Sequence, residues 1–171
     1  NLNKQILDIA ELRILKETRC GNDAVKKAFL FACFTGLGMA EIRELRWANI
    51  RKGRIQTERK KTGTRIDNKL PSTALELIGQ PKQKDDFVFD IYISETAINK
   101  NIKNWVKHAE IDKEITFYCA RHTFAVLMLG NRADLKTVAD LMGHSDIKTT
   151  TRYLNYLTDL KDKSIDNLPE L

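Results

Sequence analysis

The sequence predicts one mainly helical domain that carries a small antiparallel β-sheet, an α+β arrangement. Three observations support this fold class. Apolar residues recur at helical spacing over most of the chain. A polar stretch between residues 49 and 67 instead alternates short strand-like runs with glycine turns. The length of 171 residues suits a single domain whose core needs neither disulfides nor metal.

The elements of the first half follow from periodicity and from turn residues. Residues 24–34 are apolar almost all round, which is typical of a central buried helix. Gly53 and Gly63 separate the three strand-like runs, so the strands pair as an antiparallel sheet. The expected order is helices over 2–16, 24–34 and 40–47, strands over 49–51, 54–59 and 64–67, and a short helix over 72–78.

The second half is predicted to be helical after a brief strand over 87–89. Asp134 is a good N-cap for one of these helices, and Gly143 sits where a C-terminal glycine belongs. The expected helices cover 94–109, 117–129, 134–142 and 147–157. A polar tail follows from residue 158 to 171.

The composition limits the kind of partner. The chain has 29 Lys and Arg against 23 Asp and Glu, a net charge of +6, which suits a polyanion such as nucleic acid. No apolar run approaches the ~20 residues of a membrane span, and the N-terminus shows no apolar signal segment. We therefore expect no membrane partner.

The cysteines argue against a disulfide scaffold or a zinc site. Cys20, Cys33 and Cys119 are odd in number, and no Cys-x-x-Cys occurs. A reduced, cytoplasmic compartment is the simpler interpretation. No carboxylate and histidine cluster with metal-ligand spacing occurs either, so no metal is expected.

The densest set of chemically capable residues lies in the last third of the chain. Arg121 carries a planar charged fork that suits two phosphate oxygens. His144 can donate or pass a proton, and Tyr153 can attack phosphorus to form a covalent intermediate. Each residue alone has a structural explanation, as a core ion pair, a helix cap or a packing group. Together they are what phosphoryl transfer to a tyrosine requires.

The chain resembles the catalytic domain of the tyrosine recombinase, or phage integrase, family from about residue 2 to 156. The most specific matches are TFYCARHTFA at 116–125 and LMGHSDIKTTTRY at 141–153. The segments TGLGMAEI at 35–42, followed by LRW at 45–47, and ERKKTG at 58–63 resemble the family's first box and its hairpin lysine motif.

The resemblance implies a role for each matched residue. Tyr153 is the nucleophile that leaves a 3′-phosphotyrosine and a free 5′-hydroxyl. Arg121 and His144 hold the phosphate, and Lys61 protonates the departing 5′-oxygen. No cofactor or metal is implied, because the phosphotyrosyl bond conserves the energy for rejoining.

Two positions depart from the family pattern. Gly38 stands where the first arginine is expected, and Tyr118 stands where a histidine is expected; Tyr118 can hydrogen-bond a phosphate but is a poor base. Three accounts of Gly38 are open. Another basic residue supplies the charge, with Arg43 the nearest candidate, or the site is weakened, or catalysis has been lost.

The expected partners are double-stranded DNA and further protomers of the same recombinase in a synaptic complex. The expected phosphate contacts, each of which is also explained by a solvated basic surface, are Arg59, Lys60, Arg65, Lys148 and Arg152. We expect residues 1–157 to form the catalytic domain and 158–171 a tail that anchors on a neighbouring protomer or frays. We expect the family's N-terminal core-binding domain to be absent from this chain.

The leading hypothesis is a site-specific recombinase or integrase of a prokaryotic mobile element. A weakened or inactive DNA-binding relative of the same fold is the first alternative, because of Gly38 and Tyr118. A helix-turn-helix regulator is the second, and it leaves the spacing of Arg121, His144 and Tyr153 unexplained.

Overall fold

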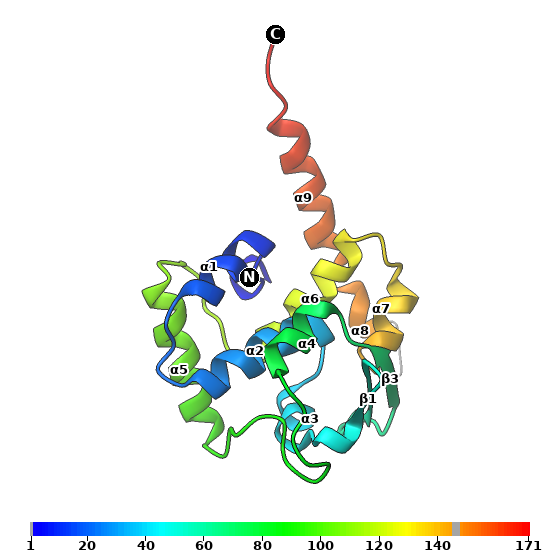
Figure 1. The fold of residues 1–171 in the computed structure, drawn as a ribbon. Coiled ribbons are helices and arrows are strands. Elements are labelled where there is room, and N and C mark those ends of the chain that lie inside the picture. Colours follow the sequence, from blue (N-terminus) through cyan, green and yellow to red (C-terminus); the bar gives the residue numbers. More distant parts are fainter. Residues whose placement is uncertain (1, 145–147) are drawn as a thin grey trace.

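The computed structural model describes residues 2–144 and 148–171. Helices make up most of this part of the chain, and a three-stranded antiparallel sheet lies at one side (Figure 1). The predicted fold class is therefore confirmed. The helical elements are η1 Leu2–Gln5, α1 Ile9–Glu17, α2 Asp23–Thr35, α3 Met39–Glu44, η2 Trp47–Asn49, α4 Ser72–Ile78, α5 Glu95–His108, α6 Cys119–Gly130, α7 Leu135–Leu141, α8 Lys148–Thr151 and α9 Leu154–Asp166. The strands are β1 Ile50–Arg51, β2 Arg54–Glu58 and β3 Arg65–Lys69.

Several predicted elements differ from the structure. The strand predicted over 87–89 is only an isolated bridge from Phe87 to Arg46, and the helix predicted over 40–47 ends at Glu44. The segment predicted as one helix over 2–16 is divided into η1 and α1, because Asp8 caps α1 by accepting the Glu11 N–H at 2.8 Å. At the other end, the helix predicted over 147–157 is divided into α8 and α9, and α9 continues to Asp166. No proline or glycine follows until Pro169, so nothing in the polar segment interrupts the helix.

Helix α2 lies at the centre of the core, as its all-round apolar sequence predicted. It packs against α4, α5 and α6. The Phe29 ring meets Trp105 and Phe117 edge-on, with centroids 5.8 and 6.0 Å apart. The Trp105 indole donates to the carbonyls of Leu15 and Thr18 at 3.1 and 3.0 Å, which fixes α5 against the end of α1. This core holds the N-terminal end of α6 in place.

The sheet turns one face toward the core and the other toward solvent. Ile55 on β2 and Ile66 on β3 are buried, and their sequence neighbours are exposed or partly exposed. The strands pair in the order β1-β2-β3. The Asn68 side chain donates to the carbonyl of Leu141 at 2.9 Å, so β3 lies beside α7 (Figure 1). The β2–β3 hairpin is thereby attached to the segment that leads to His144.

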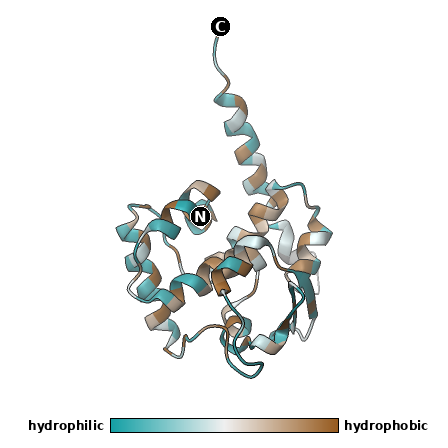
Figure 2. Ribbon diagram, in the orientation of Figure 1, coloured by the Kyte–Doolittle hydropathy of each residue, from teal (hydrophilic) through white to brown (hydrophobic). Residues whose placement is uncertain are grey.

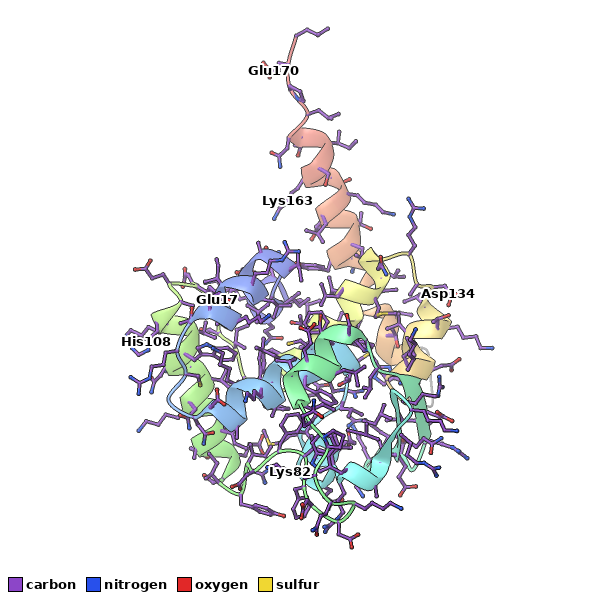
Figure 3. All side chains as sticks on the ribbon, in the orientation of Figure 1. Glu17, Lys82, His108, Asp134, Lys163 and Glu170 are labelled. Carbon is purple, nitrogen blue, oxygen red and sulfur yellow. The ribbon has the colours of Figure 1, made fainter. Side chains whose placement is uncertain are left out.

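Helix α9 extends away from the rest of the molecule (Figure 1). Its first residues pack against α6, whereas Ile165 and Leu168 beyond them are exposed. Figure 2 shows apolar and polar residues mixed along this projecting helix. Figure 3 labels Lys163 in its last turn and Glu170 in the segment beyond the helix. Within the described residues, no helix is both long enough and apolar enough to cross a bilayer.

Candidate active site

Arg121 occupies the centre of the candidate site. It lies in the first turn of α6 and is 2% exposed. One terminal nitrogen, Nη1, donates to the carbonyl of Gly36 at 2.6 Å. The other, Nη2, donates to the carbonyl of Met142 at 3.3 Å and lies 2.9 Å from His144 Nε2. Two segments distant in sequence from α6 therefore fix one guanidinium.

The surroundings leave Arg121 cationic. Burial, followed by the positive charge of Arg59, lowers its pKa to about 10, so it stays protonated at neutral pH. Among residues 2–144 and 148–171, no carboxylate forms an ion pair with it. A buried cation held by carbonyl groups attracts an anion more strongly than one that a carboxylate neutralises.

His144 is neutral and holds its proton on the nitrogen away from Arg121. Burial, with the charges of Arg121 and Arg59, lowers its pKa to about 4. A guanidinium has no acceptor, so Nε2 accepts from Arg121, and Nδ1–H donates to Thr150 Oγ1 at 2.8 Å. Thr150 on α8 thus orients the imidazole.

Tyr153 lies between α8 and α9 and is 3% exposed. Its phenol oxygen is 2.7 Å from Nδ1 of His122, the residue after Arg121. Burial raises the Tyr153 pKa to about 12, and burial followed by Arg152 and Arg121 lowers that of His122 to about 4, so both side chains are neutral at pH 7. A hydrogen bond between neutral groups links the phenol to the first turn of α6.

Tyr118 stands at the rim of this pair. It is 54% exposed and meets the His122 ring edge-on, with centroids 4.8 Å apart. Arg152 is exposed beside Tyr153, its guanidinium carbon 5.7 Å from the ring centroid. Both side chains are therefore accessible from solvent next to a buried phenol.

The β2–β3 hairpin brings two further basic residues to the site. Arg59 forms an ion pair with the buried carboxylate of Glu41 on α3. Lys61 is exposed in the hairpin turn, and its neighbour Thr62 donates to the carbonyl of Gly143 at 3.4 Å. That contact holds the turn against the residue before His144.

The remaining candidates lie elsewhere or pair with other groups. Arg43 donates to the carbonyl of Ile93 at 2.5 Å, and the structure does not bring it into the cluster around Arg121. Lys60 pairs with Glu44 at 2.6 Å, while Arg65 is exposed near Asp67. The side chain of Lys148 lies outside the described residues.

Sequence reasoning missed three contributors. It did not assign a part to Glu41, to Thr150 or to His122 as the partner of Tyr153. His122 and Thr150 do stand in the two most specific motifs, so their positions carried a signal. Glu41 lies in the first box, where the acidic residue follows Gly38 by one helical turn. Within the described part of the chain, no group of three His, Cys, Asp or Glu side chains is arranged to hold a metal ion.

Known proteins resemble both the sequence and the fold. The phage integrase family model matches residues 4–159. Tyrosine recombinase XerD of Listeria monocytogenes serotype 4b (strain F2365) is 33% identical over 147 residues, which cover 77% of this chain and 49% of the relative. Tyrosine recombinase XerD of Lacticaseibacillus casei is 43% identical over 61 residues, 36% of this chain and 21% of the relative. The matched part of this chain thus spans about half the length of the Listeria relative and a smaller share of the Lacticaseibacillus relative.

Solved structures agree on the fold. XerA recombinase superposes with a TM-score of 0.74 at 20% identity, covering 97% of this chain and 64% of that one. The catalytic domain of bacteriophage HP1 integrase gives 0.68 at 21% identity, over 96% and 98% of the two chains. The fold is that of a tyrosine recombinase catalytic domain. The chain belongs to the phage integrase family, as its motifs indicated.

Proposed function

We propose that this chain cleaves and rejoins duplex DNA at specific sites through a 3′-phosphotyrosyl intermediate, without a metal ion. One observation carries the proposal. Arg121 Nη2 lies 2.9 Å from His144 Nε2. The phenol of Tyr153 is hydrogen-bonded to His122, the residue next to Arg121. A buried cation, an imidazole and a phenol are thereby gathered from separate segments at one place.

In the proposed cleavage step, Tyr153 Oη attacks the scissile phosphorus and the bond from phosphorus to the 5′-oxygen breaks. The phenol proton passes to His122 Nδ1, which lies 2.7 Å away. Lys61 gives a proton to the departing 5′-oxygen from the exposed hairpin turn. Rejoining reverses these transfers, so no nucleotide or other energy source is consumed.

The phosphate is held by Arg121, whose charge offsets the negative charge that develops in the transition state. His144 donates to the same phosphate once Nε2 carries a proton in place of Nδ1. A nearby phosphate favours the proton on Nε2 of His144, because the phosphate attracts a hydrogen-bond donor. Tyr118 is exposed at the rim of the site and adds a hydrogen bond to the DNA backbone.

The basic residues around the site bind the DNA backbone. Lys60, Arg65 and Arg152 are exposed on the hairpin and beside Tyr153, and Lys148 begins α8. Because backbone contacts release counterions, binding weakens steeply as salt rises. A salt-independent affinity for duplex DNA contradicts this part of the proposal.

Residues 1–157 form the proposed catalytic domain, and the segment beyond them docks on a neighbouring protomer. Ile165 on the projecting helix α9 and Leu168 just beyond its end are 67% and 63% exposed (Figure 1). The double variant Ile165→Ser/Leu168→Ser should keep the melting temperature but lose assembly of protomers on DNA in sedimentation. Unchanged assembly refutes the docking role. XerH recombinase on its DNA substrate and a lambda integrase dimer on its core site are solved complexes with this fold.

The decisive experiment uses a library of nicked duplexes with randomised sequence around the nick. Covalent complexes that survive SDS are collected and their DNA is sequenced, with EDTA present throughout. We expect wild-type chain to form adducts and Tyr153→Phe to form none. Tyr156→Phe is the matched control, because Tyr156 is the next tyrosine along the chain.

The same experiment tests the inactive relative, which Gly38 and Tyr118 favour. Wild-type chain that binds duplex DNA but leaves no adduct at any sequence supports that alternative. Adducts that persist in Tyr153→Phe overturn the nucleophile assignment. Adducts that form in a parallel reaction without EDTA, but not in its presence, overturn the metal-independent step.

A further inference from the structure

Gly38 has no conformational reason to be glycine. It caps α3 with φ −85° and ψ 172°, angles that any residue adopts. The constraint is space. A Cβ at this position would lie 2.6 Å from Arg59 Nη1 and 2.9 Å from Glu41 Oε1. A side chain at position 38 and the guanidinium of Arg59 therefore exclude each other.

The structure holds that guanidinium firmly. Arg59 has only 14% of its side chain exposed, and its partner Glu41 has none exposed. The Glu41 carboxylate also accepts the backbone N–H of Gly38 at 3.0 Å and of Lys60 at 3.2 Å. Three donors therefore bind one buried carboxylate. Because Glu41 lies on α3 and Arg59 and Lys60 lie in the hairpin, these bonds join the two elements.

Arg59 also acts on the catalytic cluster through its charge. After burial, it is the largest contributor to the lowered pKa of Arg121, and it adds to burial and Arg121 in lowering the pKa of His144. The geometry agrees, because a Cβ at Gly143, the residue before His144, would lie 3.3 Å from Arg59 Cβ. Gly38, which the Arg59 guanidinium covers, is two residues from the Gly36 carbonyl that binds Arg121. Two arginines and one carboxylate, which pairs with Arg59, leave net positive charge, and an incoming phosphate offsets it.

We propose that Arg59 is the second phosphate-binding arginine of the site, reaching from the hairpin into the space above Gly38. This inference rests on the proposed function, since the anion that it binds is the scissile phosphate. Arg121 and Arg59 then hold the non-bridging oxygens from two sides. Arg43 does not bind the phosphate, because its guanidinium donates to the carbonyl of Ile93 instead.

The test exchanges the two positions. Arg59→Ala should slow adduct formation on the nicked library by about 10²–10³-fold. Gly38→Arg alone should also be slower than wild type, because two guanidiniums compete for one space. Gly38→Arg/Arg59→Ala should recover at least about tenfold over Arg59→Ala. Arg13→Ala removes an exposed arginine of α1 and serves as the control.

Loss of folding is kept apart from loss of binding. Arg59→Ala leaves Glu41 buried without its partner, so its melting temperature is measured beside its rate. Arg59→Lys keeps the charge next to Glu41 but lacks the two-pronged geometry, and it should fold and still be slower than wild type. An Arg59→Lys variant that reacts at the wild-type rate, or an exchanged double variant that folds yet reacts no faster than Arg59→Ala, overturns the proposal.

A second readout needs no cleavage. Inorganic phosphate is titrated into the wild-type chain while the Nε–H signals of Arg59 and Arg121 are followed by NMR. We expect both signals to shift with the same apparent Kd. If the wild-type chain forms adducts but phosphate does not shift the Arg59 signal, this inference is refuted and the proposed function stands. Shared shifts without any adduct refute the proposed function and support Arg59 as an anion ligand.

Discussion

The two halves of the candidate site are built in different ways. On the α6–α8 side, Arg121, His144 and Tyr153 stand at the positions that the family motifs predict. On the side of α3 and the hairpin, Gly38 departs from the pattern, yet Arg59 places a guanidinium over it. On our proposal, the site requires positive charge at one place in space, and the chain supplies it there from another element.

The two arginines also differ in what holds them. Carbonyl groups of Gly36 and Met142 orient Arg121 without neutralising it. A buried carboxylate orients Arg59 and cancels part of its charge. Arg121 should therefore contribute more to phosphate binding, and Arg59 should depend on Glu41 for its position.

Arg121→Lys should slow adduct formation by about 10²–10³-fold. Lysine keeps the charge but cannot reach the two carbonyls and His144 together, since its ammonium is a point charge without the planar fork. The rate of SDS-resistant adduct formation measures this. Arg13→Lys, on the exposed face of α1, is the control and should match wild type. A wild-type rate in Arg121→Lys would show that charge alone suffices on this side too.

Glu41→Gln should lower the free energy of unfolding by about 3 kcal/mol, because it breaks a buried ion pair. It should also slow adduct formation by about tenfold, since Arg59 loses the group that orients it. Glu44→Gln is the matched control, because Glu44 pairs with Lys60 at the surface. Chemical denaturation and the adduct assay measure both effects. Equal behaviour of the two variants would remove the special role of Glu41.

The sequence predicted one half of the site better than the other for a physical reason. Arg121, His144 and Tyr153 stand in motifs whose spacing is set by short connected helices, so local order implies proximity. Arg59 reaches Gly38 only because a hairpin folds back over α3. Nearness along the chain suggested Arg43 instead, and such nearness carries no information about a strand that returns from further along the chain.

The same limit applies to the fold. The sheet and the central helix α2 follow directly from alternation and from all-round apolar character. The division of the first helix depends on the cap at Asp8, and the length of α9 depends on the absence of a breaking residue before Pro169. Periodicity finds a helix but does not by itself find its ends.

The weakest expected effect is a pH dependence that arises from His144. Its pKa is about 4 in the folded chain because of burial, Arg121 and Arg59, against 6.5 ordinarily. Between these values the unfolded chain binds a proton that the folded chain does not, so the free energy of unfolding falls as pH drops from 6.5 toward 4. Above pH 6.5 the histidine contributes no slope.

Because His144 is partly exposed, solvent screening keeps its contribution to about 1 kcal/mol. Urea unfolding at pH 7.5 and 5.0 measures it. His144→Asn should lose less stability than wild type between these two pH values, whereas His108→Asn, an exposed position on α5, should lose as much as wild type. If His144→Asn instead loses as much as wild type, the imidazole is not held neutral between the two arginines, and the electrostatic link between the halves of the site is absent.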